Sequence, residues 1–351
     1  MAELENIIDE IEFYKQKIKE AKAKFYNYNS KQTKEKIKII DQQYAEDWAA
    51  YHGDCVEVLK GLPSESIHYS IFSPPFSSLF TYSASIRDMG NSTDEEFYDH
   101  FSFLIPELYR VLKPGRLISL HCSDIPSMKE RDGVIGLKDF PGILLKKFED
   151  VGFIYHSKVM IWKNPLIEAT RTKAIGLMHK QIIKDSSMCR QGTPDYIITI
   201  RKPGENKEFI SHENGFENYI GEDKEPIEPK NNNQKLNKYS HHVWQRYASS
   251  CWMDIKQGNT LNVKQARDKD DERHICPLQL DAIARCIELW SNPGDVILSP
   301  FGGIGSEGYQ AIKMGRKAIL IELKKSYYDV ILKNMKDAKN SMKKVSLFDL
   351  K

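Results

Sequence analysis

The sequence lacks the features of a membrane protein, a secreted protein or a disulfide-stabilised scaffold. No apolar run reaches the roughly 18–20 residues that a membrane-spanning helix requires. The first residues, Met-Ala-Glu-Leu-Glu-Asn, lack the basic start and apolar stretch of a secretory signal. The 6 cysteines form no Cys-x-x-Cys pair. We therefore expect a cytoplasmic protein with reduced thiols and no membrane partner.

Metal-ligand spacing and an excess of one charge are also missing. His274 and Cys276 stand two positions apart, but no second pair at ligand spacing joins them, so we expect no structural metal. The 51 Lys and Arg residues nearly balance the 49 Asp and Glu residues, and the formal net charge is +2. Overall charge therefore neither requires nor excludes a nucleic-acid partner. Any DNA-binding surface must be a local concentration of basic residues.

Residues 3–28 have the periodicity of an amphipathic helix. Their apolar positions recur at steps of three and four, a spacing that also suits a short coiled coil. The pattern predicts a helical arm over residues 1–45, which either docks on its own domain or forms a homodimer contact. The apolar positions are Leu4, Ile7, Ile11, Tyr14, Ile18, Ala21 and Phe25.

From about residue 50 the chain alternates between predicted strands and helices. This rhythm predicts an α/β fold with a mostly parallel twisted sheet and helices on both faces. The segment Lys113-Pro114-Gly115 is a strong helix stop. The predicted strands are 69–72, 116–121, 154–162, 295–298 and 317–322, and the predicted helices are 95–112, 140–151, 277–290 and 306–314.

A polar stretch over residues 163–273 interrupts this rhythm. It is rich in Lys, Arg, Asn, Gln and His, and it contains an acidic run over residues 213–228. We expect an irregular insert with long loops, which divides one α/β domain into residues 46–162 and 274–336. Residues 337–351 would then form a C-terminal tail.

A glycine-rich loop, Phe301-Gly302-Gly303-Ile304-Gly305-Ser306, lies between a predicted strand and a predicted helix. Glycine lets a ligand approach the backbone, and the helix N-terminus adds partial positive charge. Glu322 ends the next strand about twenty residues later, where an acid accepts hydrogen bonds from ribose hydroxyls in dinucleotide folds. The combination predicts a ribose-containing cofactor, with NAD as one option. Many such loops bind nothing, and an exposed strand-end acid is the alternative for Glu322.

The segment Ser73-Pro74-Pro75-Phe76 follows a predicted buried strand. Two prolines remove two backbone donors and make the loop rigid. The Ser73 hydroxyl and a loop carbonyl would accept the hydrogens of an amino group, while Phe76 stacks on the ring that carries it. Taken alone, the motif is better interpreted as an ordinary turn closed by a core phenylalanine.

Together, the two loops resemble the beta-class amino-methyltransferases of DNA. These enzymes carry a (Ser/Asp/Asn)-Pro-Pro-(Tyr/Phe/Trp) motif early, then a target-recognition region, then a Phe-x-Gly-x-Gly loop, and this chain has that order. The resemblance covers about residues 50–162 and 241–332. Within the family, the sequence most resembles the stand-alone modification methylases of phages or prophages. It implies a Rossmann-like methyltransferase fold with circularly permuted motif order. The insert would then be a target-recognition region.

The resemblance further implies an S-adenosyl-L-methionine-dependent, site-specific DNA methyltransferase of the restriction-modification kind. Such an enzyme flips a base out of the duplex and methylates its exocyclic amine by direct in-line transfer. Serine at the first motif position is typical of N4-cytosine enzymes and aspartate of N6-adenine enzymes, so N4-cytosine is favoured. Carbon-5 methylation is rejected, because Cys276 precedes Pro277 instead of following a proline. An RNA or small-molecule methyltransferase and a non-catalytic DNA-binding module remain as alternatives.

By the same resemblance, individual residues receive roles. Asp54 would hold the adenine end of the cofactor and Glu322 its ribose, although Asp54 could equally cap a helix. The motif departs from the family at Ser299, where Asp is usual, and at Ile304, where a small residue is usual; we expect the second change to be tolerated. The implied catalytic residues are Ser73, Pro74, Pro75 and Phe76, and the implied cofactor residues are Asp54, Phe301, Gly302, Gly303, Ile304, Gly305, Ser306, Glu322, His274 and Pro277.

Two further segments suggest macromolecular partners. A basic run within the insert is predicted to contact double-stranded DNA, with a solvated helix face as the alternative. Near the end, Val345-Ser346-Leu347-Phe348 resembles the short peptides that bind bacterial sliding clamps, with Lys344 at the usual Gln position. A docked or frayed terminus is the alternative there. The predicted DNA-binding residues are Arg171, Lys173, Lys180 and Arg190.

Overall fold

The computed structural model of the chain describes residues 39–75, 94–127, 129–172, 174–222, 238–262 and 278–348. The predicted amphipathic helix over 3–28, with its dimer contact, lies outside these residues. The first described element is strand β1 (Ile39–Tyr44), which pairs antiparallel with β2 (Trp48–Gly53). The predicted arm boundary at residue 45 is therefore wrong, because residues 39–44 already belong to the sheet.

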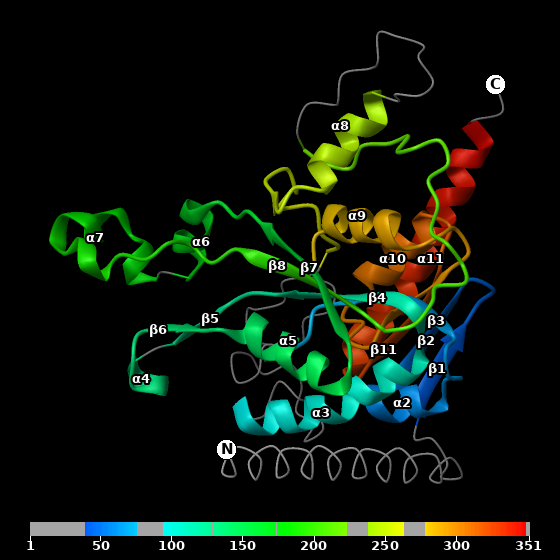
Figure 1. Ribbon diagram of the computed structural model, residues 1–351, viewed down its shortest axis with the longest axis horizontal. Helices are drawn as coiled ribbons and strands as arrows, with labels where there is room; N and C mark the ends of the chain where they lie inside the picture. Colours follow the sequence, from blue (N-terminus) through cyan, green and yellow to red (C-terminus); the bar gives the residue numbers. More distant parts are fainter. Residues whose placement is uncertain are drawn as a thin grey trace, which may run out of the picture. The chain divides into compact units, whose positions relative to one another are not determined.

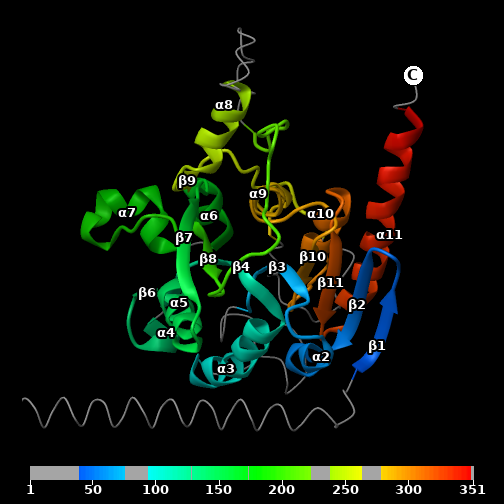
Figure 2. The ribbon, with the colours of Figure 1, turned by 45° about the vertical axis from the view of Figure 1, so that its right-hand side comes forward.

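The described strands of the main sheet follow the order β1-β2-β11-β10-β3-β4-β8-β7-β9. Most of these strands are labelled in Figure 1, and Figure 2 also labels β9 and β10. Strands β2, β11 (Lys317–Glu322), β10 (Val296–Ser299), β3 (Ile67–Phe72) and β4 (Leu112–Cys122) run parallel to one another. Strand β8 (Asp195–Arg201) pairs antiparallel with β4 and β7 (Ile154–Ile161), and β9 (Cys251–Trp252) runs parallel to β7. The predicted α/β fold with a mostly parallel sheet is confirmed.

Helices cover both faces of this sheet (Figure 2). One face packs against α2 (Cys55–Gly61), α3 (Asp94–Val111) and α5 (Phe140–Val151), the other against α9 (Leu280–Trp290), α10 (Ser306–Lys313) and α11 (Lys325–Phe348). Alternate residues of one strand supply the two cores. In β4, Ile118 and Leu120 join the first core and Leu117 joins the second.

The predicted elements of the two α/β halves are confirmed to within a few residues. Helix α5 matches the predicted range 140–151, because Asp139 accepts a hydrogen bond from the Gly142 N–H at its start, and Gly152 ends it at a φ of 111°. Strand β11 matches the range 317–322. Helix α3 ends at Val111, just before the predicted stop.

The stretch over residues 163–273 is only partly irregular, so its prediction as one irregular insert is wrong. Strand β8 lies inside it and takes a place in the sheet between β4 and β7. Between β7 and β8 the chain projects as an arm, which we define as residues 165–172 and 174–188. The arm contains α6 (Pro165–Thr172), η3 (Ile175–Leu177), α7 (His179–Lys184) and η4 (Ser186–Met188). Helix α8 (Lys238–Tyr247) precedes β9.

A small antiparallel sheet of β5 (Ile125–Ser127) and β6 (Gly136–Lys138) follows β4, with α4 (Lys129–Asp132) between its strands. At the other end, α11 continues to Phe348, so residue 337 does not begin a separate tail. The side chains of residues 345–348 lie outside the described ones. No described helix is long and apolar enough to cross a membrane.

Candidate active site

The two sequence motifs meet at the carboxyl ends of neighbouring strands. Strand β3 leads into Ser73-Pro74-Pro75 and β10 leads into the glycine loop, and the two strands pair in the sheet. Ser70 Oγ donates to the Leu298 carbonyl at 2.8 Å, although the two residues are 228 positions apart. The ring centroids of Phe72 and Phe301 are 5.7 Å apart. Because parallel strands end at one edge of a sheet, distant loops form one site.

A chain of polar contacts begins at Ser73; we call it the Ser73 network (Ser73, His121, Asp195 and Lys163). Ser73 Oγ lies 2.8 Å from Nδ1 of His121, which stands near the end of β4. The other ring nitrogen, Nε2, lies 3.3 Å from Asp195 Oδ2 at the start of β8. Asp195 Oδ1 accepts a hydrogen bond from Lys163 Nζ at 2.7 Å. The network thus joins the Ser-Pro-Pro loop to the base of the arm.

The carboxyl group of Asp195 is ionised. Burial raises its pKa, but His121 and Lys163 lower the pKa more strongly, and the net result lies well below the usual range. Asp195 and His121 are only 8% and 5% exposed. The network therefore places a carboxylate behind the imidazole ring where little water competes, and charge-assisted hydrogen bonds are strong in such surroundings.

The glycine loop is pressed against the end of β11. The Gly302 N–H donates to the Ile321 carbonyl at 2.7 Å, and a Cβ on Gly302 would lie 3.2 Å from that oxygen. Gly305 has a φ of 88°, a left-handed conformation that disfavours other residues. Close approach therefore favours glycine at position 302, and backbone geometry favours it at position 305.

Glu322 holds this loop in place. Its Oε2 accepts the Gly303 N–H at 2.7 Å, and its Oε1 accepts the Lys324 N–H at 2.8 Å. A carboxylate is an acceptor with about four lone-pair sites. The acid predicted to bind a ribose thus also braces the loop.

Two polar side chains beside the loop are buried at the start of α10. Ser306 Oγ has no hydrogen-bond partner among the described residues. Glu307 is 5% exposed, and burial together with the charge of Glu322 raises its pKa to about 8. Buried polar groups normally find partners, so this donor and acceptor set fits a ligand with hydroxyl or cationic groups.

Two predicted cofactor residues, Phe301 and Ile304, pack into the protein. The Phe301 ring stacks on Phe101 with centroids 6.3 Å apart. Ile304 is buried and packs in a cluster with Tyr327 and Val330 of α11. The larger side chain at position 304 is accommodated because it packs against α11.

Asp54 caps helix α2, the alternative that its sequence context left open. Its Oδ1 accepts hydrogen bonds from the N–H groups of Val56 and Glu57 at 2.9 and 3.1 Å. It nevertheless follows β2 at the same edge as Glu322, because His52 and Glu322 are register partners. The remaining predicted site residues Phe76, His274 and Pro277 lie outside the described residues.

The predicted DNA-binding residues have different surroundings. Lys180 is exposed on α7. Arg190 Nη1 lies 3.7 Å from Oε1 of the buried Glu168, so this arginine helps to hold the arm together. The Arg171 side chain and Lys173 are outside the described part of the chain.

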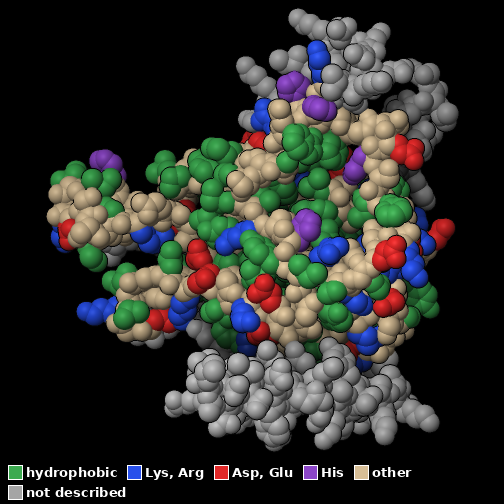
Figure 3. Space-filling view, viewed as in Figure 1, with side chains coloured by type: hydrophobic (Ala, Val, Ile, Leu, Met, Phe, Trp, Pro, Cys, Tyr) green, Lys and Arg blue, Asp and Glu red, His purple; other side chains and the backbone are tan. Residues whose placement is uncertain are grey.

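The arm also exposes large hydrophobic side chains, which the composition of the stretch did not indicate. Figure 3 shows hydrophobic groups on the projecting segment that contains α6 and α7. Ile183 is 80% exposed and stands next to Lys184. The exposed hydrophobic residues of the arm are Leu166, Ile167, Ile182, Ile183 and Met188.

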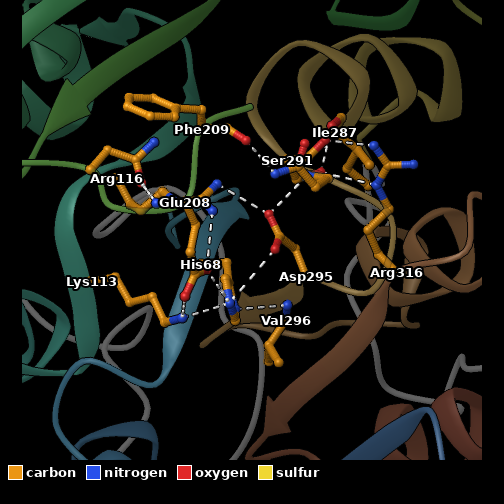
Figure 4. A network of polar contacts seen from close by, with 12 residues as sticks. His68, Lys113, Arg116, Glu208, Phe209, Ile287, Ser291, Asp295, Val296 and Arg316 are labelled. Carbon is orange, nitrogen blue, oxygen red and sulfur yellow. Dashed lines mark hydrogen bonds and ion pairs between the residues drawn. The ribbon is translucent and has the colours of Figure 1, made fainter. Parts of the chain in front are cut away.

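A second histidine-centred network lies at the opposite edge of the sheet, near the starts of β3 and β10 (Figure 4). We call it the His68 network (His68, Lys113, Arg116, Glu208 and Asp295). His68 Nδ1 accepts the backbone N–H of Val296 at 3.1 Å, and Nε2 lies 3.1 Å from Glu208 Oε2.

The His68 network contains one group of possible metal ligands. Single ligand atoms of His68, Glu208 and Asp295 lie within 4.8 Å of one another. Lys113 Nζ is 2.6 Å from a Glu208 oxygen, and Arg116 Nη1 is 3.1 Å from an Asp295 oxygen. Because these cations already neutralise both carboxylates, we interpret the network as a set of ion pairs.

Comparison with known proteins adds to this geometry. A family model described as DNA methylase matches residues 67–333, a range that includes both loops and the Ser73 network. The chain belongs to this N6/N4 DNA methylase family. The match confirms the family that the sequence motifs predicted.

Two named relatives of the methylase are called methyltransferases, and the name of one of them states the base. DNA adenine methyltransferase YhdJ of Escherichia coli K12 is 25% identical over 298 residues, which are 81% of this chain and 81% of YhdJ. Type II methyltransferase M.MjaI of Methanocaldococcus jannaschii is 22% identical over 77% of this chain and 85% of its own.

Solved structures share the fold of the methylase. The PvuII DNA methyltransferase, titled cytosine-N4-specific, has a TM-score of 0.55 and 16% identity over 86% of this chain and 95% of its own. A Thermus thermophilus protein solved with S-adenosyl-L-methionine has a TM-score of 0.55 and 20% identity over 84% of this chain and 94% of its own.

Sequence reasoning missed three members of the Ser73 network: His121, Asp195 and Lys163. One signal was available, since His121 ends the predicted strand that follows the one leading into the Ser-Pro-Pro motif. Lys163 and Asp195 carried no such signal, because Asp195 fell in a stretch interpreted as irregular. Only the pairing of β8 with β4 brings its carboxylate behind His121.

Proposed function

We propose that this methylase transfers a methyl group from S-adenosyl-L-methionine to the exocyclic N4 amine of cytosine in double-stranded DNA. The observation that carries the proposal is the adjacency of the Ser73-Pro74-Pro75 loop and the glycine loop at one edge of the sheet. A DNA methylase must hold a methyl donor beside a base amine, and catalysis without a covalent intermediate depends on that positioning. These neighbouring loops offer one place for each reactant.

The residues around the glycine loop fit S-adenosyl-L-methionine. Glu322 would accept hydrogen bonds from its ribose hydroxyls, and the backbone of residues 302–305 allows close approach. Ser306 offers a buried hydroxyl that no described group bonds. When bound, the cofactor supplies an electrophilic methyl group. Three further residues keep their predicted cofactor roles in this proposal: Asp54, His274 and Pro277.

At the other loop, the protein would increase the nucleophilicity of a weakly nucleophilic amine. The Ser73 hydroxyl oxygen and the Pro74 carbonyl would accept the two amine hydrogens, which favours a more pyramidal nitrogen with a localised lone pair. Pro75 keeps the loop rigid, and Phe76 would stack on the base. The base must first leave the duplex, at a cost of a few kcal/mol.

The arm is the part of the chain that we assign to DNA contact. It leaves the sheet after β7 and returns at β8, at the edge where Ser73 lies. The exposed Lys180 would pair with phosphate, and Arg171 and Lys173 belong to the same predicted basic run. Exposed apolar groups such as Ile183 can wedge between bases and favour their unstacking.

The choice of cytosine rests on Ser73, since serine at this motif position is typical of N4-cytosine enzymes. N6-adenine methylation is the second candidate, and the similarity to an E. coli DNA adenine methyltransferase favours it. Both bases present a similar exocyclic amine to the same acceptors.

The test incubates the purified chain with isotope-labelled S-adenosyl-L-methionine and either duplex DNA or RNA. Digestion of the DNA to nucleosides and mass analysis should then show N4-methyldeoxycytidine. N6-methyldeoxyadenosine would assign the second candidate. Transfer to RNA alone, or no transfer to either polymer, would overturn the proposal.

A further inference from the structure

The surroundings of His121 determine which ring nitrogen carries its proton. Nε2 lies 3.3 Å from Oδ2 of the ionised Asp195, which is an acceptor only. This contact has ion-pair distance but not hydrogen-bond geometry, and the negative charge beside Nε2 favours a neutral His121 with its proton on that nitrogen. Nδ1 is then left as an acceptor. Ser73 Oγ, 2.8 Å from Nδ1, must then donate its hydroxyl proton to the ring. The lone pairs of Ser73, rather than its proton, remain for a base amine.

We propose that His121 is a positioning residue that orients Ser73 as an acceptor and receives, through Ser73, the proton released on methylation. This inference rests on the proposed methyl transfer at the same site. The product nitrogen initially carries one proton too many. That proton passes from nitrogen to Ser73 Oγ, while the Ser73 hydroxyl proton passes to His121 Nδ1. One N–H and one O–H bond break, one of each forms, and His121 becomes an imidazolium.

Asp195 and Lys163 complete this pathway. The Asp195 carboxylate faces Nε2 and stabilises the imidazolium that forms. Lys163, 2.7 Å from the other carboxylate oxygen, keeps Asp195 ionised and so keeps the transferred proton on His121. Lys163 is too far along the chain of contacts to touch the substrate, so its effect passes through Asp195.

The charge of Lys158 on β7 is separated from His121 by the sheet. The neighbouring Cys122 and its register partner Tyr196 alternate to the opposite face of β4 and β8. Lys158 Nζ lies 4.1 Å from the centroid of the Tyr196 ring on that face. On the face that carries His121, the charge in contact with the ring is that of Asp195, with Lys163 behind it. The buried ion pair of Arg285 and Asp254 lies on the same face of the sheet, where α9 packs.

The variant His121→Asn separates orientation from proton acceptance. The side-chain oxygen of asparagine can take the position of Nδ1 and accept the Ser73 hydroxyl, but it does not bind a proton at neutral pH. His121→Ala removes both functions. Single-turnover methyl transfer to duplex DNA is measured for each variant from about pH 5 to 8, the range in which histidine titrates.

The wild-type rate should fall on acidification, because an already protonated His121 cannot accept the hydroxyl proton. His121→Asn should be slower by about 10²-fold at pH 8, within the range of general acid–base effects, and its rate should not depend on pH. His121→Ala should be slower still. A wild-type rate and pH profile in His121→Asn would overturn the inference. Melting temperature and binding of S-adenosylhomocysteine identify any variant that fails to fold. If a His121 variant fails to fold, Asp195→Asn is measured in its place.

A second measurement does not depend on activity. In protein labelled with ¹⁵N-histidine, the resonances lost in His121→Asn assign the ring, and their shifts report the tautomer. We expect the proton on Nε2 and a changed Nδ1 shift in Ser73→Ala; a proton on Nδ1 contradicts the inference. If the wild type transfers no methyl group to DNA, the proposed function fails instead.

Discussion

His68 stands near the start of β3 and His121 near the end of β4, so the two rings lie at opposite edges of one sheet. Both accept a hydrogen bond at Nδ1. The donor to His68 is the backbone N–H of Val296, whereas the donor to His121 is the hydroxyl of Ser73. A backbone N–H fixes the strand that carries it but exchanges no proton during turnover. A hydroxyl can pass its proton on, so the same ring contact serves structure at one edge and chemistry at the other.

The charges around the two rings also differ, and the difference again favours a structural role for His68 and a role in proton transfer for His121. Burial lowers the pKa of His68, and Lys113 and Arg116 lower it further against the opposing effect of Asp295 and Glu208. His68 therefore stays neutral as a structural acceptor. Behind His121 a single ionised carboxylate, Asp195, faces Nε2. A proton that arrives at His121 has a stabilising partner.

The largest effect is expected from Asp295→Ala in the His68 network. Arg116 is 1% exposed, and its Nη1 pairs with Asp295 at 3.1 Å. Removing one partner of a buried pair leaves an uncompensated charge, so unfolding free energy should fall by about 3–5 kcal/mol. Urea unfolding measures this, while methyl transfer per folded molecule should persist. An unchanged free energy would show that Arg116 does not depend on Asp295.

Ser73→Ala tests the edge of the sheet at which we propose that methyl transfer occurs. The substitution removes an acceptor for the base amine and the link to His121, so methyl transfer should fall about 10²–10³-fold. Urea unfolding should be nearly unchanged, since Ser73 is only partly buried. The matched control is Ser66→Ala, whose exposed hydroxyl bonds only the Pro63 carbonyl among the described residues. Equal rates in the two variants would remove Ser73 from the site.

Asp195→Asn should show a pH-dependent loss of stability. The pKa of Asp195 is lower in the folded protein than in the unfolded chain, so its contribution is complete above the unfolded value and is lost as pH falls. The variant should be about 1–3 kcal/mol less stable at pH 7. Below about pH 4 the difference should shrink. Urea unfolding at pH 7 and pH 3 checks this, and a constant difference would contradict it.

The smallest effect is expected from Glu208→Gln. This carboxylate pairs with Lys113 and lies near His68, but it is about half exposed to solvent. Solvent screens such pairs, so unfolding free energy should change by less than about 1 kcal/mol. Methyl transfer should equal that of the wild type. A loss as large as that of Asp295→Ala would mean that the exposed half of the His68 network matters as much as the buried half.

Features that depend on neighbouring residues in the chain were predictable. The range of α5, the stop after α3 and the glycine loop all depend on local chemistry, which does not change with the partners that the segment finds in the fold. The orientation of side chains within a motif was less predictable. Phe301 and Ile304 belong to the loop, yet they pack against α3 and α11, because the loop is also a part of the core.

Strand β8 shows why the middle of the chain was misinterpreted. Its isoleucines at positions 197, 198 and 200 are buried, but polar residues surround it in sequence, and composition averages over both. An antiparallel strand between β4 and β7 is recognised only through its partners. Its first residue, Asp195, then falls opposite the end of β4, where no sequence spacing would place it.

The sequence by itself determined the α/β alternation, the two motifs and the family, because each of these depends on contiguous residues with fixed local geometry. The tertiary structure alone decided that Ser73 faces His121, that Asp195 stands behind that ring, and that the similar ring of His68 is held by backbone. The physical reason is strand order. Residues far apart in the chain become hydrogen-bond partners only when the sheet is assembled, and register then decides which donor meets which acceptor.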